Sequence, residues 1–205
     1  MPLRKNNILK IGISGNIGSG KSLAIKFFKH KRYPAYDLDN ISREIMSPGE
    51  KCYKKILKLF GSDILYKNKN LNRNKIKKII FKDNKIREKY NSIVHPEIFG
   101  KVKEYVKFHI NKKDNIIFFE GALISKNTKI GKYLDKIILI KSKKSEIIRR
   151  VSIRDGMQIS EIYNILEAQN TINIYAKDFD YVVSNNEKIY NFENKLNSIL
   201  EKISH

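Results

Sequence analysis

The eight residues Gly15 to Ser22, GNIGSGKS, constrain the fold more than any other stretch of the sequence. They satisfy the pattern G-x-x-x-x-G-K-[ST] without a mismatch. The apolar run ILKIGI at 8–13 precedes them, and residues 22–30, with apolar side chains at helical spacing, follow. A strand, a glycine-rich loop and a helix in this order surround phosphate oxygens with backbone N–H groups. The stretch therefore predicts a loop that holds a nucleoside triphosphate.

The residue types within the loop suit this ligand. Glycines let the backbone turn its N–H groups inward, and the following helix N-terminus adds positive potential. Lys21 is expected to reach the β and γ phosphates, and the Ser22 hydroxyl to bind Mg²⁺. The spacing is not G-x-G-x-x-G, which disfavours a dinucleotide site; a glycine turn that merely caps a helix is the remaining alternative. The residues expected to bind ATP are Gly15, Asn16, Ile17, Gly18, Ser19, Gly20, Lys21 and Ser22.

Further apolar runs predict the rest of the sheet. NIIFFE at 115–120 and KIILI at 136–140 are typical of strands buried on both faces of a parallel sheet, and DYVVS at 180–184 indicates another strand before a closing helix. Residues 50–111 read as helical, punctuated at His95-Pro96, and two more helices meet around Asp155-Gly156. Strands that alternate with helices predict an α/β fold with a doubly wound parallel sheet.

A length of 205 residues suits one domain, which we place at 8–203. Its core is expected to comprise residues 8–47, 114–142 and 178–203. A helical insertion is expected at about 50–111, and a small helical lid at about 143–177.

Composition narrows the protein class further. Cys52 is the single cysteine, so neither an intramolecular disulfide nor a thiolate zinc cluster can form, which fits a reducing cytoplasm. No segment has the roughly 18 to 20 apolar residues that span a bilayer, so we expect a soluble protein. The net charge of +21 is compatible with phosphate-rich partners, but a coding bias toward lysine, isoleucine and asparagine is the favoured explanation, because the lysines are spread along the chain.

Two aspartates are the first candidates for the chemistry. Asp37 and Asp39 follow a strand-like segment, in the polar turn DLDN, where a carboxylate can orient and deprotonate an attacking hydroxyl. The alternative is a helix cap for the run that starts at Asn40.

Basic residues gather later in the chain, at the junction of the two lid helices. Arg149, Arg150 and Arg154 could neutralise charge on transferring phosphates if the segment closes over them. A solvated basic helix face is the ordinary alternative.

These features occur in an order that resembles the dephospho-CoA kinase family from Ile11 to about Leu200. IGISGNIGSGKS is similar to the opening of that family, and YPAYDLDNISREIMSPG to its D-x-D-x-x-x-R segment with a P-G turn. The matching segments that follow are FGSDIL, LNRNKIKKIIFKDNKIREKYNSIVHPEI, RRVSIRDGM, EAQ and DYVVSNN.

The resemblance implies a P-loop NTPase-type fold with a helical acceptor-binding insertion and a lid. It implies transfer of the γ-phosphoryl group of ATP, with Mg²⁺, to the 3′-hydroxyl of dephospho-CoA, giving CoA and ADP. Asp39 becomes the preferred general base, with Asp37 beside it. The other residues that the resemblance implicates are Arg43, His95 and Glu120 at the acceptor, Arg150 and Arg154 in the lid, and Asn185 near the adenine.

The sequence departs from the family pattern at several positions. Glu120 stands in place of the usual aspartate, and Lys126 in place of an acidic residue six positions later. Ile165 stands where a lid arginine is common, although Lys177 offers a substitute charge. His95, which precedes a proline, has a structural alternative as the holder of a turn.

Two other functions compete with this one. Another P-loop kinase of nucleosides or nucleotides shares the loop and the arginines but does not explain D-x-D-x-x-x-R joined to a long helical insertion. A basic nucleic-acid-binding protein with a vestigial loop is a different class, but the lysines are dispersed and no nucleic-acid module is present. We therefore expect a small-molecule substrate, and no specific nucleic acid or membrane partner.

Overall fold

The computed structural model describes residues 8–122, 124–169 and 179–204. The chain divides into two compact units. Residues 1–37 and 106–205 form the first, here called the sheet unit, and residues 38–105 form the second, here called the helical unit. The chain thus leaves the sheet unit after Asp37 and returns within one long helix.

The sheet unit contains five parallel strands in the order β2-β3-β1-β4-β5. Their bounds are Leu9–Ser14 for β1, Ala35–Asp37 for β2, Ile116–Glu120 for β3, Lys136–Lys141 for β4 and Tyr181–Ser184 for β5. β3 is buried along its whole length and β4 along its four central residues, as the continuous apolar runs predict. The expected α/β parallel sheet is confirmed.

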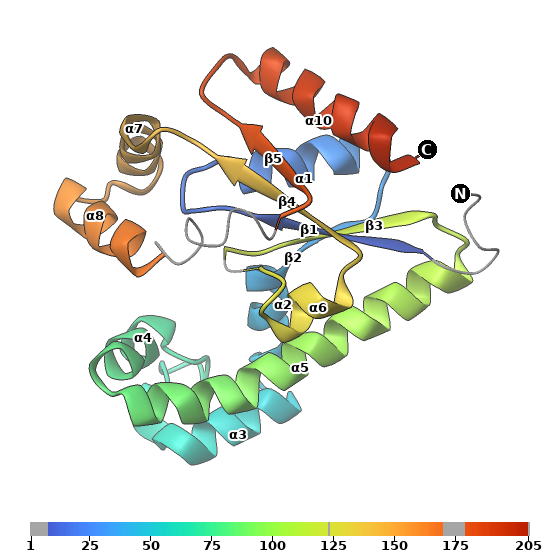
Figure 1. The fold of residues 1–205 in the computed structure, drawn as a ribbon. Coiled ribbons are helices and arrows are strands. Elements are labelled where there is room, and N and C mark those ends of the chain that lie inside the picture. Colours follow the sequence, from blue (N-terminus) through green and yellow to red (C-terminus); the bar gives the residue numbers. More distant parts are fainter. Residues whose placement is uncertain (1–7, 123, 170–178, 205) are drawn as a thin grey trace. The chain divides into compact units, whose positions relative to one another are not determined.

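Helices α1 (Lys21–His30) and α10 (Ile189–Ser204) cover one face of this sheet (Figure 1). Their apolar stripes pack on the strands in one cluster, in which Phe28 stacks on Phe118 with ring centroids 3.8 Å apart. Phe28 and Phe118 are both fully buried. This cluster fixes the start of α1, and with it the preceding loop, against the sheet.

The opposite face is covered by a short helix and by the end of a long one. Gly12 faces Leu134 and Ile124, which flank α6 (Lys129–Tyr133), and a Cβ on Gly12 would lie 2.8 Å from a Leu134 methyl group. Tyr36 stacks on Phe119 of the same face and forms a hydrogen bond with His109, close to the end of helix α5 (Asn84–Asn111). Cover on both faces makes this a doubly wound sheet.

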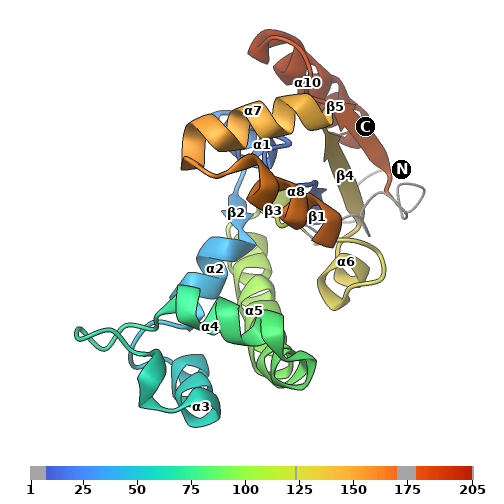
Figure 2. The same ribbon diagram turned by 90° about the vertical axis from the view of Figure 1, so that its left-hand side faces the viewer.

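Two helices follow β4 and lie side by side (Figure 2). They are α7 (Lys144–Asp155) and α8 (Ile159–Ala168), joined through Gly156, whose φ of 64° ends α7 in a left-handed turn. A small apolar cluster that includes Val151 and Ile162 holds them together. The expected pair of helices around Asp155-Gly156 is present; the remainder of the expected lid, residues 170–177, lies outside the described residues.

The helical unit consists of α2 (Leu38–Ile45), α3 (Lys51–Phe60), a 3₁₀ turn η1 (Ser62–Ile64), α4 (Arg73–Lys82) and most of α5 (Asn84–Asn111). The DLDN turn that we expected is absent, because α2 begins directly after β2. The buried residues Leu38, Ile41 and Ile45 share one helical face, so the helical pattern already starts at Leu38.

The break expected at His95-Pro96 is wrong. Pro96 lies inside α5, which continues for 28 residues from Asn84 to Asn111. A proline removes one N–H donor from the helical ladder and disfavours helical geometry in the residue before it. Val94 and Val102, buried on either side, hold both halves of the helix in the core, so the local cost does not end the helix.

A search of the helices within the described residues finds no candidate membrane span.

Candidate active site

The carboxyl edge of the sheet offers a binding site beside β1. The chain runs from β1 to β2 and β3 on one side, and then crosses to β4 and β5 on the other. In open α/β sheets, ligands bind outside the carboxyl ends of the strands at such a switch point. The loop Gly15–Ser22 lies at this point, between β1 and α1.

The loop requires glycine for steric reasons. Gly15, Gly18 and Gly20 have φ values of 153°, 68° and 110°. A Cβ on Gly20 would overlap the amide nitrogen of Asn185, whose Nδ2 donates to the Ser19 carbonyl at 2.9 Å. Left-handed backbone angles and close backbone approach together explain the glycine pattern of the loop.

Lys21 lies in a largely buried, charged environment. Its Nζ donates to the Asn16 carbonyl at 3.1 Å and lies 4.0 Å from Glu120 Oε1 at the end of β3. The side chains of Lys21 and Glu120 are 10% and 8% exposed. The ammonium group is thus held inside the loop, where an incoming phosphate would meet it.

Other polar groups of the loop face a small cavity of about 170 Å³, lined by Asn16, Ser19 and Ser142 among others. Gln169 reaches back from the end of α8, and its Oε1 accepts a hydrogen bond of 2.9 Å from the Ile17 N–H. The hydroxyl groups of Ser14 and Ser19 are buried and have no hydrogen-bond partner among the described residues. Buried hydroxyl groups without a hydrogen-bond partner are uncommon in folded proteins.

Two carboxylates flank the loop on the β3 side. Asp37 ends β2 and Glu120 ends β3, and the two residues are direct partners in the parallel pairing. Neighbouring strands lie about 4.8 Å apart, so both acids occupy the same sheet edge. Asp37 and Glu120, which we predicted as site residues, are therefore brought together beside the loop.

Asp39 lies two residues further on, in the first turn of α2. A position inside the helix excludes the alternative that it caps a run beginning at Asn40. Arg43 lies in the last turn of the same helix. Whether Asp39 acts as the base stays a prediction.

Arg73, at the start of α4, is a residue that our sequence analysis did not single out. Its Nη2 donates to the Ser42 carbonyl at 3.3 Å. Burial lowers the pKa of Arg73, Arg43 lowers it further, and Tyr90 and Asp39 act in the opposite direction. The helical unit therefore gathers two guanidinium groups close to Asp39, a suitable arrangement for an anionic acceptor.

His95 lies in the interior of α5, which excludes the structural alternative that it holds a turn. Partial burial lowers the pKa of its imidazole and so favours the neutral ring. A neutral ring can donate or accept a hydrogen bond, and its predicted role at the acceptor stays a prediction.

The predicted lid arginines have unequal surroundings. Arg154 forms a two-pronged pair with Asp155 at 2.7 and 2.8 Å, and its side chain is 59% exposed. Arg150 is 25% exposed and bonds to the Ser142 hydroxyl and the Asn185 carbonyl. Asn185, predicted near the adenine, is 5% exposed and packs against the loop.

The oxygen donors at the sheet edge fit a nucleotide-borne magnesium ion. Among the described residues no three His, Cys, Asp or Glu side chains form a metal-binding group. Mg²⁺ usually keeps several waters and is bound by one or two carboxylates together with substrate phosphates. Ser22, at the first turn of α1, and the carboxylates of Asp37 and Glu120 provide such a donor set.

Comparison with known proteins identifies the family of this chain. A family model described as dephospho-CoA kinase matches residues 9–191. A dephospho-CoA kinase from Fusobacterium nucleatum is 32% identical over 197 residues, covering 96% of this chain and 100% of that protein. Another from Lactobacillus acidophilus is 30% identical and covers 94% of this chain and 96% of that protein. This chain belongs to the dephospho-CoA kinase family.

Solved structures share the fold. A dephospho-CoA kinase from Campylobacter jejuni aligns with a TM-score of 0.69 at 21% identity, covering 95% of this chain and 96% of that one. A shikimate kinase from Bacteroides thetaiotaomicron aligns with a TM-score of 0.54 at 15% identity, covering 97% of this chain and 100% of that one. The dephospho-CoA kinase fold is thus related to that of a second small-molecule kinase.

The departures from the dephospho-CoA kinase pattern have identifiable surroundings. Lys126, in place of an acid, lies 3.4 Å from Asp180, away from the loop at the start of β5. Ile165 lies in α8 and supplies no charge. Lys177, the suggested substitute, lies outside the described residues.

Proposed function

We propose that this protein transfers the γ-phosphoryl group of ATP to the 3′-hydroxyl of the ribose of dephospho-CoA, giving CoA and ADP. The observation that carries the proposal is an intact G-x-x-x-x-G-K-S loop at the switch point, with acids at the ends of the two adjacent strands, in a chain of the dephospho-CoA kinase family. The hydrogen bond that holds Lys21 inside the loop supports its proposed role in phosphate binding.

In this proposal Asp39 accepts the proton of the 3′-hydroxyl while that oxygen attacks phosphorus. Positioned general bases typically contribute about 10² to 10⁴ in rate. Asp37 assists beside it, either near the acceptor or around the metal. Arg43, Arg73 and His95 orient the acceptor, so we propose the helical unit as the acceptor-binding part of the enzyme.

Charge on the transferred group is neutralised from the sheet unit. Lys21 and the loop N–H groups of residues 15–22 hold the phosphates, and Arg150 and Arg154 from α7 compensate the charge that develops at the transition state. We propose α7 and α8 as a lid. Arg154 would then leave Asp155 and bind a phosphate. Breaking the Arg154–Asp155 pair costs little free energy because the pair is largely exposed.

When bound with ATP, magnesium would neutralise negative charge on the phosphates. We propose that the Ser22 hydroxyl holds it, supported by the acids at the sheet edge. Asn185 supports the loop close to where the adenine binds. The single cysteine and the absence of a membrane-spanning helix in the described residues are compatible with the cytoplasmic location that we propose.

ADP release from ATP and Mg²⁺ tests the proposal, with dephospho-CoA, adenosine, AMP and no acceptor run side by side. We expect turnover confined to dephospho-CoA, with CoA identified as the product by mass spectrometry. Turnover with a different acceptor would support a P-loop kinase but refute the assignment of dephospho-CoA as its substrate. Nucleotide binding without turnover of any acceptor, or tight salt-dependent binding of RNA in its place, would refute the enzymatic proposal.

A further inference from the structure

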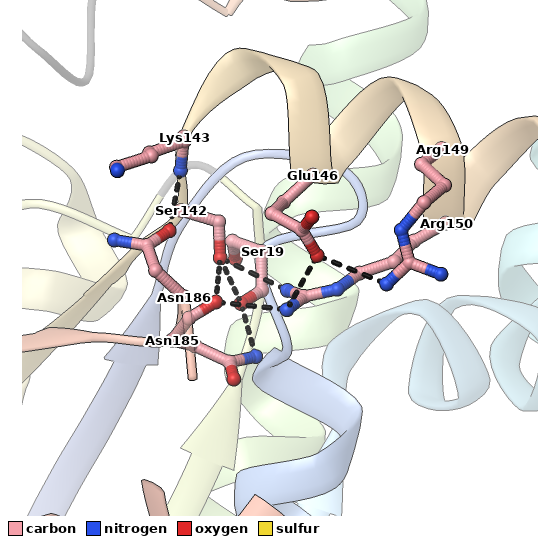
Figure 3. A network of polar contacts seen from close by, with 8 residues as sticks. All are labelled: Ser19, Ser142, Lys143, Glu146, Arg149, Arg150, Asn185 and Asn186. Carbon is pink, nitrogen blue, oxygen red and sulfur yellow. Dashed lines mark hydrogen bonds and ion pairs between the residues drawn. The ribbon is translucent and has the colours of Figure 1, made fainter. Parts of the chain in front are cut away.

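One hydroxyl group connects three parts of the sheet unit (Figure 3). Ser142 directly follows β4, and its Oγ lies 3.0 Å from the carbonyl oxygen of Ser19 in the loop. It also lies 2.8 Å from the carbonyl oxygen of Asn185, just after β5, and 3.1 Å from Nη1 of Arg150 in α7. The nucleotide loop, the end of β5 and the first lid helix thus converge on this serine.

The two carbonyl groups have other donors. Asn185 Nδ2 donates to the Ser19 carbonyl at 2.9 Å, and Arg150 Nη2 donates to the Asn185 carbonyl at 2.9 Å. A serine hydroxyl has one proton to donate and lone pairs to accept with. It can therefore donate to only one carbonyl at a time, and the other carbonyl stays satisfied by its second donor in either case.

Loss of the Ser142 hydroxyl would affect the hydrogen bonds of the Arg150 side chain more than those of the two carbonyl groups. Its Nη1 donates to the Ser142 hydroxyl, while Nη2 bonds to the Asn185 carbonyl and lies 3.4 Å from Glu146. Glu146 also accepts a hydrogen bond of 3.0 Å from Arg149, so its charge is shared. Removal of the Ser142 hydroxyl would leave both carbonyls bonded and deprive Nη1 of this acceptor.

We propose that Ser142 is a positioning residue for Arg150. By accepting from Nη1 while Asn185 accepts from Nη2, it fixes the plane of the guanidinium group and holds α7 against the nucleotide loop. The functional part of this inference rests on the proposed phosphoryl transfer, in which Arg150 compensates developing charge. The geometric part is independent of the acceptor.

The geometric part is tested first, in the full-length protein without substrate. Arginine side-chain ¹⁵N–¹H NMR spectra are compared for wild type, Ser142→Ala and Ser142→Thr, with the Arg150 signals assigned from Arg150→Ala. We expect Ser142→Ala to shift the Arg150 signals and speed their exchange with water, and Ser142→Thr to retain the wild-type behaviour. Unchanged Arg150 signals in Ser142→Ala would overturn the proposal.

The functional part is tested by kinetics with ATP, Mg²⁺ and dephospho-CoA. A hydrogen bond to a charged group is worth enough to predict a fall in kcat of about tenfold in Ser142→Ala, with ATP affinity changed less than about threefold. Because Ser142 is proposed to act through Arg150, Ser142→Ala in an Arg150→Ala background should cause no further loss. Ser145→Ala, in the exposed first turn of α7, is the matched control and should behave as wild type.

The outcomes separate the two proposals. Shifted and faster-exchanging Arg150 signals in Ser142→Ala, together with an inactive wild type, would refute the acceptor assignment and support the positioning role. Additive losses of kcat in the double variant, or a lowered melting temperature with normal kcat, would refute the positioning role while leaving dephospho-CoA turnover intact.

Discussion

The charge of Glu120 opposes nucleotide binding in the resting protein, and Glu120→Gln is therefore expected to tighten it. The carboxylate lies 4.0 Å from Lys21 Nζ, and both side chains are about nine-tenths buried. A bound phosphate is repelled by Glu120 and must share the Lys21 ammonium with it. The amide of glutamine has nearly the same shape, so the change removes charge with little change in packing.

The magnitude follows from the geometry. Two unit charges 4.0 Å apart interact by about 4 kcal/mol at an effective dielectric constant of about 20. The substituted amide keeps part of the polar interaction, and a phosphate lies further from Glu120 than Lys21 does. We therefore expect a gain of about 1 to 2 kcal/mol in binding, or roughly 5- to 30-fold in Kd. The same change should destabilise the free protein, because a buried ammonium loses a counter-charge.

The assay is isothermal titration calorimetry with ADP in EDTA, which separates the charge effect from any contact between Glu120 and magnesium. Thermal unfolding with and without ADP tests both expected effects of the substitution. Compared with wild type, Glu120→Gln should unfold at a lower temperature without ADP and should be stabilised more by added ADP. Glu201→Gln, which makes the same charge change at an exposed position late in α10, should match wild type in both measurements.

A weaker or unchanged Kd for metal-free ADP in Glu120→Gln would refute the reasoning. It would mean that Glu120 serves the nucleotide by orienting Lys21 and does not compete with it. Tighter binding of Glu201→Gln as well would refute it differently, since the effect would then come from total charge and should vanish at high salt.

Four further predictions concern other parts of the molecule. Asp39→Asn should lower kcat by about 10² to 10⁴ with unchanged ADP affinity, and near-normal turnover would exclude Asp39 as the base. Arg73→Ala should raise the KM for dephospho-CoA about tenfold or more without affecting ADP affinity; an unchanged KM would remove Arg73 from the acceptor site. Tyr36→Phe removes the 2.6 Å hydrogen bond to buried His109 and should lower the free energy of unfolding in urea by about 1 to 3 kcal/mol, whereas wild-type stability would show that the bond contributes nothing net. Burial raises the pKa of the Cys52 thiol to about 11, so the protonated thiol stabilises the fold below the ordinary thiol pKa, and this contribution is lost as the pH rises through 11. The difference in unfolding free energy between wild type and Cys52→Ala should therefore shrink over that pH range. A constant difference would contradict the assigned pKa.

The sheet was predictable because its strands are buried on both faces. Runs such as NIIFFE leave few alternatives to a covered parallel strand, and β3 indeed begins and ends within one residue of the expected bounds. The start of α2 was not predictable from polarity, since DLDN has the composition of a turn. Its decisive signal was Leu38, the first member of an apolar helical face whose other members follow three and seven positions later.

The residues that sequence analysis missed share a physical cause. Ser142, Gln169 and Arg73 bond to backbone carbonyl or N–H groups of segments distant in the sequence. Every residue except proline carries both of these backbone groups, so no residue type marks where a partner lies. Gln169 was visible within the EAQ segment that matches the family, but its bond to the Ile17 N–H depends on how α8 returns to the loop.

The same principle accounts for how the resting loop is held. Two of the groups that we assign to phosphate binding have protein partners within the sheet unit: Lys21 bonds to the Asn16 carbonyl and faces Glu120, and the Ile17 N–H bonds to Gln169. A buried ammonium or N–H group without a partner is costly, so these contacts keep the free loop folded. Each of them must weaken or be shared when phosphate arrives, which limits ground-state affinity and favours release of ADP. Glu120→Gln is informative for this reason, because it alters one such contact and leaves the loop sequence intact.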